Sequence, residues 1–290
     1  MPLSRPDDPL SVPNRWADPD PFDPEGVCLA AGLAGLELLA ETPSTMDRAR
    51  ELAASDAPLP LAVVAQRQTL GRGRRGARWW QPDGALAMSI VIDGVRGATL
   101  GEAAGARGVT PLWSLVCGVA LAETLAILVP EIEPQIRWPN DVVASGRKLA
   151  GILVETAPQG RVIFGIGVNT TGSASAAPHP LRQRVGTLPD LAGRSLPRGQ
   201  LLAALVPRLL GLLSETARDP GVLVERYRPL CSLSGSQVTF HREDGHRLSG
   251  RCHSIDADGA LVLDTAVGLV HLVRGSLTDP AEVWRGDLSG

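Results

Sequence analysis

The segment QIRWPNDVVASGRKLAGILVETAPQGRVIFGIGVNTT, residues 135–171, decides the fold. It contains three stretches rich in apolar and β-branched residues, QIRWPNDVVAS, RKLAGILVETA and RVIFGIGVNTT, with short turns between them. Apolar stretches of this length, bounded by turn residues, are typical of buried β-strands. We therefore expect three consecutive strands that form a meander at the centre of a sheet.

Further strands and a helix are expected on the N-terminal side of this meander. Short apolar runs at 61–68 and 85–93 predict two more buried strands. A helix is expected to begin within TPSTMDRARELAASD, because Ser44 or Thr45 can act as its N-cap.

The longest apolar stretch, residues 111–129, approaches the length of a membrane span. Polar residues interrupt it at Ser114, Glu123 and Thr124, so a buried core helix is the better interpretation. Another helix is expected at about 198–217. The pattern as a whole predicts an α/β (α+β) protein in which helices flank a mixed sheet.

Composition divides the chain into three parts. Residues 1–26 are dense in Pro and Asp and are expected to be irregular, without room for an N-terminal winged-helix DNA-binding domain. Residues 27–230 hold the predicted sheet and helices. In residues 231–290, several short strands separated by turns such as Asp244–Gly245 predict a small all-β barrel.

Charge and cysteine usage narrow the class of protein. A formal net charge of −3 and a pI of about 6.0 argue against a chain devoted to non-specific nucleic-acid binding. The four cysteines are far apart and form no C-x-x-C pair, which disfavours structural zinc and a disulfide framework. The first residues contain no apolar signal-peptide core. We expect a cytoplasmic protein without a membrane segment.

The segment QTLGRGRRGARWW, residues 68–80, places three glycines among four arginines. The glycine spacing matches the dinucleotide-binding fingerprint, but two tryptophans and a proline follow where that fingerprint requires a helix. A Walker-type phosphate loop is excluded because no Gly-Lys-Ser/Thr follows. The sequence favours an anion-binding hairpin loop, with a solvated basic turn or a nucleic-acid contact as alternatives.

Lys148 is the only lysine in the chain, although Lys and Arg together number 28. A codon bias toward arginine would explain this count without any function. Alternatively, this position needs a compact ammonium that acts as a point charge in a tight pocket, whereas arginine suffices elsewhere. The residues alone leave both explanations open.

Four separated blocks resemble the biotin protein ligases, in the order that the family has them. These blocks are PSTMDRA, QTLGRGRRGARWW, RWPNDVVASGRKLAGILVE and GIGVNT. The resemblance covers roughly residues 41–280. It implies a class II synthetase-like catalytic domain followed by an SH3-like β-barrel, and it allows homodimers that form by sheet pairing.

The chemistry implied by the resemblance uses ATP, Mg²⁺ and biotin. The biotin carboxylate attacks the α-phosphate of ATP, which gives biotinyl-5′-AMP and pyrophosphate. A lysine of the biotin carboxyl carrier protein domain of acetyl-CoA carboxylase or a related carboxylase then attacks the activated carbonyl. Two anions meet in the first step, so fixed cations must neutralise their charge. A ligase without a DNA-binding domain is implied.

The resemblance also implies roles for individual residues. Catalytic roles fall to Lys148, Arg72, Arg74 and Asp141, with no metal site beyond the Mg²⁺ that ATP brings and a contact from Asp141. Biotin binding falls to Ser44, Thr45, Met46, Gln68, Arg72, Gly73, Arg74, Lys148 and Gly151. ATP binding falls to Arg72, Arg74, Arg75, Arg78, Trp79, Asn140, Lys148 and Asn169. The loop 171–186 would be a lid over the adenylate.

Local patterns offer structural alternatives for several of these residues. Ser44 or Thr45 can simply cap a helix. Asn140 and Asp141 are typical of an Asx-rich turn, and Trp79 is equally suited to core packing.

Three positions depart from the family pattern: Met46 stands where Asn is usual, Ala77 where a loop Arg is usual, and Arg137 where Lys is usual. These departures affect the expected affinity more than the reaction class. Two rival functions remain. A lipoate or octanoyl transferase-like acyl transfer enzyme would lack the arginine loop, and a non-enzymatic nucleic-acid-binding module fits poorly with the acidic pI.

Overall fold

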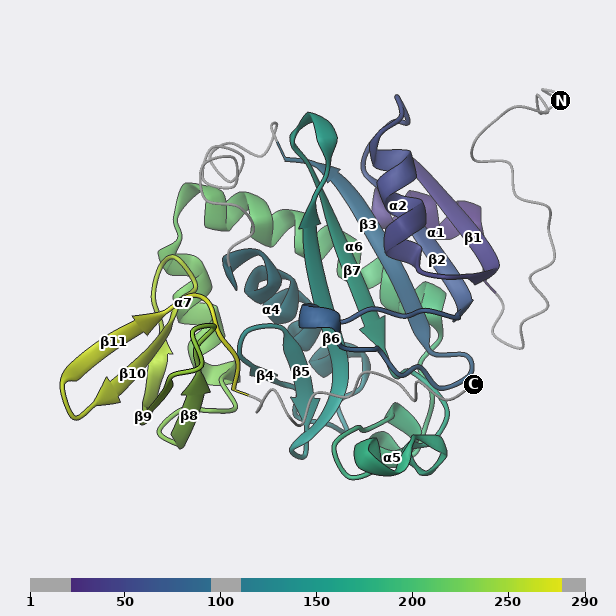
Figure 1. Ribbon diagram of the computed structural model, residues 1–290. Coiled ribbons are helices and arrows are strands. Elements are labelled where there is room, and N and C mark those ends of the chain that lie inside the picture. Colours follow the sequence, from purple (N-terminus) through teal and green to yellow (C-terminus); the bar gives the residue numbers. More distant parts are fainter. Residues whose placement is uncertain (1–21, 95–110, 278–290) are drawn as a thin grey trace, which may run out of the picture.

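The computed structural model describes residues 22–94 and 111–277 (Figure 1). Its helices are α1 (Pro24–Ala31), α2 (Thr45–Ala53), α4 (Pro111–Leu128), α5 (Leu188–Ala192), α6 (Arg198–Arg218) and α7 (Gly221–Tyr227). Its strands are β1 (Gly35–Thr42), β2 (Leu61–Gln68), β3 (Leu86–Asp93), β4 (Gln135–Arg137), β5 (Asp141–Ala144), β6 (Arg147–Thr156), β7 (Arg161–Val168), β8 (Gln237–His241), β9 (Arg247–Ile255), β10 (Leu261–Thr265) and β11 (Gly268–Leu272). Single 3₁₀ turns are η1 (Arg74–Gly76), η2 (Pro158–Gly160), η3 (Ala174–Ala176), η4 (His179–Leu181) and η5 (Arg228–Leu230).

Seven strands form one mixed sheet in the order β1-β2-β3-β7-β6-β5-β4. The pair β1–β2 is parallel and the other neighbouring pairs are antiparallel. The predicted meander is confirmed, but it runs from the centre of the sheet at β7 to the edge at β4 and does not lie wholly at the centre. Its first stretch, however, forms two strands, because the turn at Trp138–Asn140 folds β4 back on β5. Pro139 has no N–H for a sheet ladder, which favours a turn at this point.

Strands β2, β3 and β7 are buried on both faces, which explains their nearly continuous apolar runs. In β2, Ala62 and Val64 belong to the larger core, which includes residues of α1, α4 and α6. Leu61 and Val63 alternate with them and pack with α2 on the opposite face. Figure 1 shows α4 and α6 behind the sheet and α2 in front of it.

Helix α4 is apolar on all sides and lies between the sheet and α6. It is long and apolar enough to cross a membrane, but 78% of its apolar window is buried inside the protein. Such a helix is a core helix when other elements cover it. That prediction is confirmed: Trp113 on α4 is buried and packs against Phe164, with ring centroids 6.2 Å apart.

Strands β8 to β11 form a separate four-stranded antiparallel sheet. This C-terminal sheet contacts the rest of the protein through Trp138, whose indole Nε1 donates to the Gly259 carbonyl over 3.0 Å. Phe240 packs on the same indole, with ring centroids 5.7 Å apart. The predicted all-β character of the region is confirmed, whereas SH3-like barrel closure stays a prediction.

Two N-terminal elements differ from expectation. Helix α1 begins at Pro24, inside the segment expected to be irregular, and the first 21 residues of that segment lie outside the described residues. The sequence of β1, GLELLAET, contains one β-branched residue, so it gives no strand signal. It is a strand because its backbone pairs with β2 along almost its whole length.

Candidate ligand-binding site

A cavity of about 460 Å³ lies on the α2 side of the central sheet. This volume falls within the range of small-molecule sites. Its walls come from the start of α2, the loop 71–79, strands β5 to β7, the segment 181–185 and the C-terminal residues 275–277. Five regions that are separated in the sequence thus meet around one space.

Lys148 reaches this cavity because β6 contains a bulge. Along β6, Ala150 and Ile152 face the larger core. A regular strand would point Lys148, two residues before Ala150, into the same core. The pairing of β6 with β5 shifts at Leu149, which is left without a partner, and Lys148 lines the cavity together with Gly151. A one-residue irregularity therefore moves the ammonium to the cavity wall.

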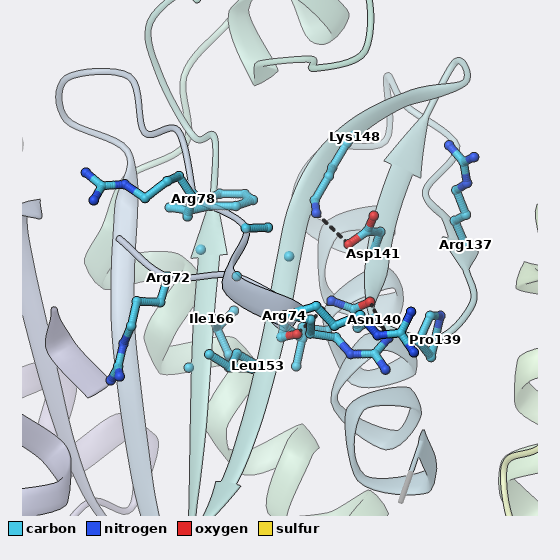
Figure 2. Close-up of a pocket in the computed structure, with 18 of the residues that line it drawn as sticks. Arg72, Arg74, Arg78, Arg137, Pro139, Asn140, Asp141, Lys148, Leu153 and Ile166 are labelled. Atoms are coloured by element: carbon cyan, nitrogen blue, oxygen red, sulfur yellow. Dashed lines mark hydrogen bonds and ion pairs between the residues drawn. The ribbon is translucent and has the colours of Figure 1, made fainter. Parts of the chain in front are cut away.

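The Lys148 ammonium faces a carboxylate inside the cavity. Its Nζ lies 2.6 Å from Oδ1 of Asp141, as Figure 2 shows. The side chains of the pair are 33% and 25% exposed, so both groups remain accessible from the cavity. Nζ also lies 5.4 Å from the ring centroid of Trp79, within cation–π range. Asp141 and the Trp79 ring thus hold the ammonium from two sides, and a third side can contact a bound anion.

The segment 71–79 is an ordered hairpin loop. Arg72 and Arg78 form an isolated antiparallel bridge, and the Gly73 N–H donates to the Ala77 carbonyl over 2.8 Å. The tip is the turn η1, and no α-helix lies between this loop and β3. The hairpin prediction is confirmed, and the dinucleotide alternative is excluded for the reason given by the sequence.

The arginines of this loop diverge, each toward a protein group. Figure 2 shows Arg72 and Arg78 directed away from Lys148. The contacts are Arg72 to Asp47 at 2.6 Å, Arg74 to Asn140 Oδ1 at 3.4 Å, Arg75 to Glu243 at 3.2 Å and Arg78 to the Thr69 carbonyl at 3.2 Å. The protein's own oxygens therefore order the loop.

Arg74 is the most buried cation of the loop. Burial lowers the pKa of its guanidinium, and the charge of Arg75 lowers it further, while Asp141 and Glu243 act in the opposite direction. A largely buried cation that donates a single long hydrogen bond, to the Asn140 side-chain oxygen, gains from a bound anion. The local electrostatics therefore favour an anionic ligand next to Arg74.

A chain of polar side chains forms another wall. Ser89 Oγ donates to Thr45 Oγ1 over 2.8 Å, and Thr45 donates to Gln68 Oε1 from its hydroxyl over 3.2 Å and from its N–H over 2.9 Å. Because Gln68 Oε1 accepts both bonds, the amide orientation is fixed and its NH₂ is the group left to donate. Ser44 accepts from the Met46 N–H over 3.3 Å and caps α2, as its structural alternative predicted.

Glycines open the floor of the cavity to large side chains. Gly151 in β6 and Gly167 in β7 pair in register, and a Cβ on either would lie 2.9 Å or 2.6 Å from the Trp79 ring. A Cβ on Gly165 would lie 2.5 Å from the sulfur of Met46. The Trp79 Nε1 is buried and has no hydrogen-bond partner within the described part of the chain. Trp79 thus lays its ring over the glycine floor, with its Nε1 buried close to Gly167.

The structure brings together every predicted site residue but one. All line the cavity except Asn169, which is 1% exposed and lies behind its wall. Leu181, Gln183 and Val185 also line it and belong to the loop 171–186 that was expected to be a lid, whereas Met88, Leu153, Gly165, Ile166 and Gly275–Leu277 were not predicted. The strand residues could have been found from a weak sequence signal, because side chains alternate between the two faces along β3, β6 and β7. No sequence signal marks Gly275–Leu277 as part of the site.

Comparisons with known proteins agree with this geometry. Residues 38–170 match the Biotin/lipoate A/B protein ligase family. The chain is 33% identical to the Biotin–[acetyl-CoA-carboxylase] ligase of Mycobacterium tuberculosis, across 85% of this chain and 90% of that relative. It is 32% identical to the Bifunctional ligase/repressor BirA of Escherichia coli, across 76% of this chain and 64% of that relative.

A solved structure shows the same fold. The biotin protein ligase from Aquifex aeolicus, in complex with biotin and ATP, superposes with a TM-score of 0.70 at 25% identity, covering 83% of this chain and 96% of that one. Fold and site therefore define an enzyme of the biotin and lipoate ligase class. Within that class, this chain belongs to the biotin protein ligases.

Proposed function

We propose that this protein activates biotin with ATP and transfers the biotinyl group to a lysine of a biotin carboxyl carrier domain of acetyl-CoA carboxylase or a related carboxylase. The observation that carries the proposal is the convergence of Lys148, the arginine loop and the Gln68 amide on one cavity. The substrates named for the relatives, biotin and ATP, suit these groups.

In the first step a carboxylate oxygen of biotin attacks the α-phosphorus of ATP, and the bond from that phosphorus to the β-phosphate oxygen breaks. Lys148 sits between the two anions and offsets their repulsion as a compact charge. Arg74 and Arg72 exchange their contacts with Asn140 and Asp47 for phosphate oxygens. Pyrophosphate leaves, and biotinyl-5′-AMP remains in the cavity.

The fused rings of biotin occupy the wall formed by Thr45 and Gln68. The Gln68 NH₂ donates to the ureido carbonyl, while Met46 and Leu153 contact the apolar ring. This places the biotin side chain across the floor of Gly151, pointing to Lys148. Met46 stands where the family usually has Asn, so it offers biotin no side-chain amide. Its sulfur packs against Gly165 instead, and its contact with the biotin ring depends on shape and not on hydrogen bonds.

In the second step the carrier lysine attacks the acyl carbon, and the bond to the AMP phosphate oxygen breaks. Asp141, which faces Lys148 in the cavity, is the nearest carboxylate to accept the proton that the amine loses. The segment 181–185 covers one side of the cavity and excludes water from the mixed anhydride.

Mg²⁺ is expected to enter with ATP. Within residues 22–94 and 111–277 there is no cluster of three or more His, Cys, Asp or Glu side chains that would hold a metal ion by itself. A cation held mainly by triphosphate oxygens, with Asp141 as a single protein contact, fits the side chains around the cavity. Bound there, it would neutralise phosphate charge.

The setting of the reaction follows from the same features. All four cysteines are free thiols, which suits the reducing cytoplasm where we place the enzyme. The protein partner is the carrier domain, and DNA has no role in the proposal. A homodimer through the exposed edge of the central sheet remains part of the proposal.

The test is to incubate the protein with ATP, Mg²⁺ and labelled biotin, alone and with a carrier domain. We expect pyrophosphate release, retention of the adenylate and label on one carrier lysine. Octanoate and lipoate in place of biotin test the acyl-transferase alternative, and labelling by these acids but not by biotin would replace our proposal. Binding of duplex DNA with steep salt dependence, without any pyrophosphate release, would favour the nucleic-acid alternative.

A further inference from the structure

Asn169 is buried outside the cavity and makes three hydrogen bonds to neighbouring backbone groups. It follows β7 directly, and its side-chain Nδ2 donates to the Gly186 carbonyl over 2.8 Å. Its backbone N–H donates to the Leu149 carbonyl over 2.9 Å, and its own carbonyl accepts from the Leu188 N–H over 2.9 Å. One residue therefore joins the bulged part of β6 to the end of the loop 171–186 and to the start of α5.

The segment Arg184–Gly186, which we call the strap, binds Lys148 through both of its backbone groups. The Lys148 N–H donates to the Arg184 carbonyl, and the Gly186 N–H donates to the Lys148 carbonyl, each over 2.8 Å. Lys148 and Val185 thus form an isolated parallel bridge. The β6–β7 pairing ends at Ala150 and Val168, and the strap continues the pairing of β6 beyond that point, while Lys148 stays opposite Val143 of β5.

The strap also forms part of the cavity wall, since Arg184 and Val185 line it. Gly186 is packed closely: a Cβ there would lie 2.8 Å from Leu191 and 3.2 Å from the Cβ of Arg147. Without the Asn169 donor, the Gly186 carbonyl would lose its buried partner in the described structure. The strap would then shift toward solvent and take the Lys148 backbone with it.

We propose that Asn169 is a positioning residue, which acts through the strap to set the Lys148 ammonium against Asp141 and to hold the cavity wall in place. The nucleotide contact that the family resemblance implies for Asn169 stays a prediction, because its side-chain Oδ1 has no hydrogen-bond partner within the described residues. This inference deepens the proposed function, and only its kinetic readout rests on that function. Its structural readouts apply to the protein without any substrate.

The single lysine makes a direct test feasible. Protein labelled with [¹³Cε]lysine gives one lysine side-chain NMR signal, which belongs to Lys148. We expect Asn169→Ala to move and broaden this signal, and to speed hydrogen exchange of the Lys148 and Gly186 amides by about tenfold. The matched control is Thr170→Val, because the buried Thr170 hydroxyl makes no hydrogen bond within the described residues. It should leave both readouts unchanged.

Kinetics then separate positioning from general destabilisation. Asn169→Ala should lower kcat for pyrophosphate release by about tenfold or more, with a smaller change in KM for biotin. Should this variant fail to fold, Gly186→Ala moves the strap while Asn169 stays in place, and the same NMR shift is expected. A wild-type lysine signal and wild-type exchange in folded Asn169→Ala or Gly186→Ala would overturn the inference. If wild-type protein releases no pyrophosphate but the NMR changes occur, the proposed function fails while the positioning role stands.

Discussion

At the scale of single residues, the site concentrates charge without adding much stability. The Lys148–Asp141 pair is about a third to a quarter exposed, and the Arg72–Asp47 pair is more exposed still. Ion pairs at such positions contribute roughly 0–1 kcal/mol to folding. Substituting these residues should therefore change chemistry more than stability, which makes them suitable for direct tests.

Replacing Lys148 with Ala or Arg should abolish adenylate formation, because neither side chain places a compact cation between two oxyanions. We expect pyrophosphate release to fall by about a hundredfold or more. The thermal midpoint should change little, since the lost ion pair is partly exposed. Near-normal pyrophosphate release from Lys148→Arg would remove the lysine from the assigned role.

Replacing Arg72 with Ala should reduce the amount of biotinyl adenylate that stays bound. The guanidinium lies at the cavity and can exchange Asp47 for a phosphate oxygen. Gel filtration after a single turnover measures the retained adenylate. Arg67→Ala is the matched control, because Arg67 pairs with Glu41 on the exterior and does not line the cavity. Equal retention in the two variants would argue against a role for Arg72.

At the scale of elements, the sequence predicts what depends on local pattern and misses what depends on tertiary pairing. Buried strands such as β2 and β7 are visible because they are apolar on both faces. Strand β1 is not, because GLELLAET lacks strand formers and owes its form to β2. The bulge at Leu149 is equally invisible, since nothing in RKLAGILVE marks where register shifts.

The candidate site divides in the same way. The arginine loop was predicted from its own glycines and arginines, whereas the role of Lys148 was implied by the family resemblance, because a single lysine leaves a codon bias as an equal explanation. Asn169 was predicted as a site residue but lies behind the wall, since GIGVNT does not reveal which face its last polar side chain takes. Ser89 was missed because a lone serine in an apolar strand has no functional pattern before Thr45 is placed beside it.

The loop 171–186 is fastened at its base by Asp190, and this fastening should depend on pH. Partial burial, the largest influence, would raise the pKa of Asp190, but hydrogen bonds from Ala174, Thr187 and Ser173, with the charge of Arg147, outweigh it and lower the pKa. A carboxylate whose folded pKa is depressed stabilises above its unfolded pKa of about 3.9, and loses this effect as pH falls through the folded value.

We therefore expect the Ala174 amide, which donates to Asp190 over 2.7 Å, to keep constant protection from hydrogen exchange down to about pH 4 and to lose it below. In Asp190→Ala, which removes the acceptor, the protection should be low throughout and independent of pH. Intrinsic exchange rates at each pH provide the correction. Identical protection profiles for the two proteins would contradict this account.

At the scale of the whole molecule, the C-terminal sheet completes the site. Gly275–Leu277 line the cavity, and Glu243 holds Arg75 of the arginine loop. The attachment depends on the turn at Gly259, whose carbonyl binds the Trp138 indole. Because Trp138 directly precedes the turn to Asp141, the docking of the C-terminal sheet and the position of the site carboxylate are linked.

Gly259→Ala should weaken this docking. The residue has φ +77°, and a Cβ would lie 2.7 Å from the backbone nitrogen of Leu112 on α4. Gly245→Ala is the control, because Gly245 has φ +85° but no neighbour within 4 Å. Both variants should lose roughly 1 kcal/mol to left-handed strain. Only Gly259→Ala should lose about 1–3 kcal/mol more from overpacking. Equal denaturation midpoints would show that the contact is unimportant.

The scarcity of lysine affects how readily such an enzyme would be acylated by the biotinyl adenylate that it forms. An acyl adenylate that escapes the cavity acylates amines, whereas guanidinium groups stay protonated and do not attack. Apart from its N-terminus, this chain offers one amine, and that amine is bound to Asp141. Its exterior should therefore resist labelling during turnover. Arg184→Lys at the cavity rim should acquire biotin detectable by mass spectrometry, and the remote, exposed Arg228→Lys far less. If Arg184→Lys forms the adenylate but acquires no biotin, protection from self-labelling does not explain the scarcity of lysine, and codon bias alone does.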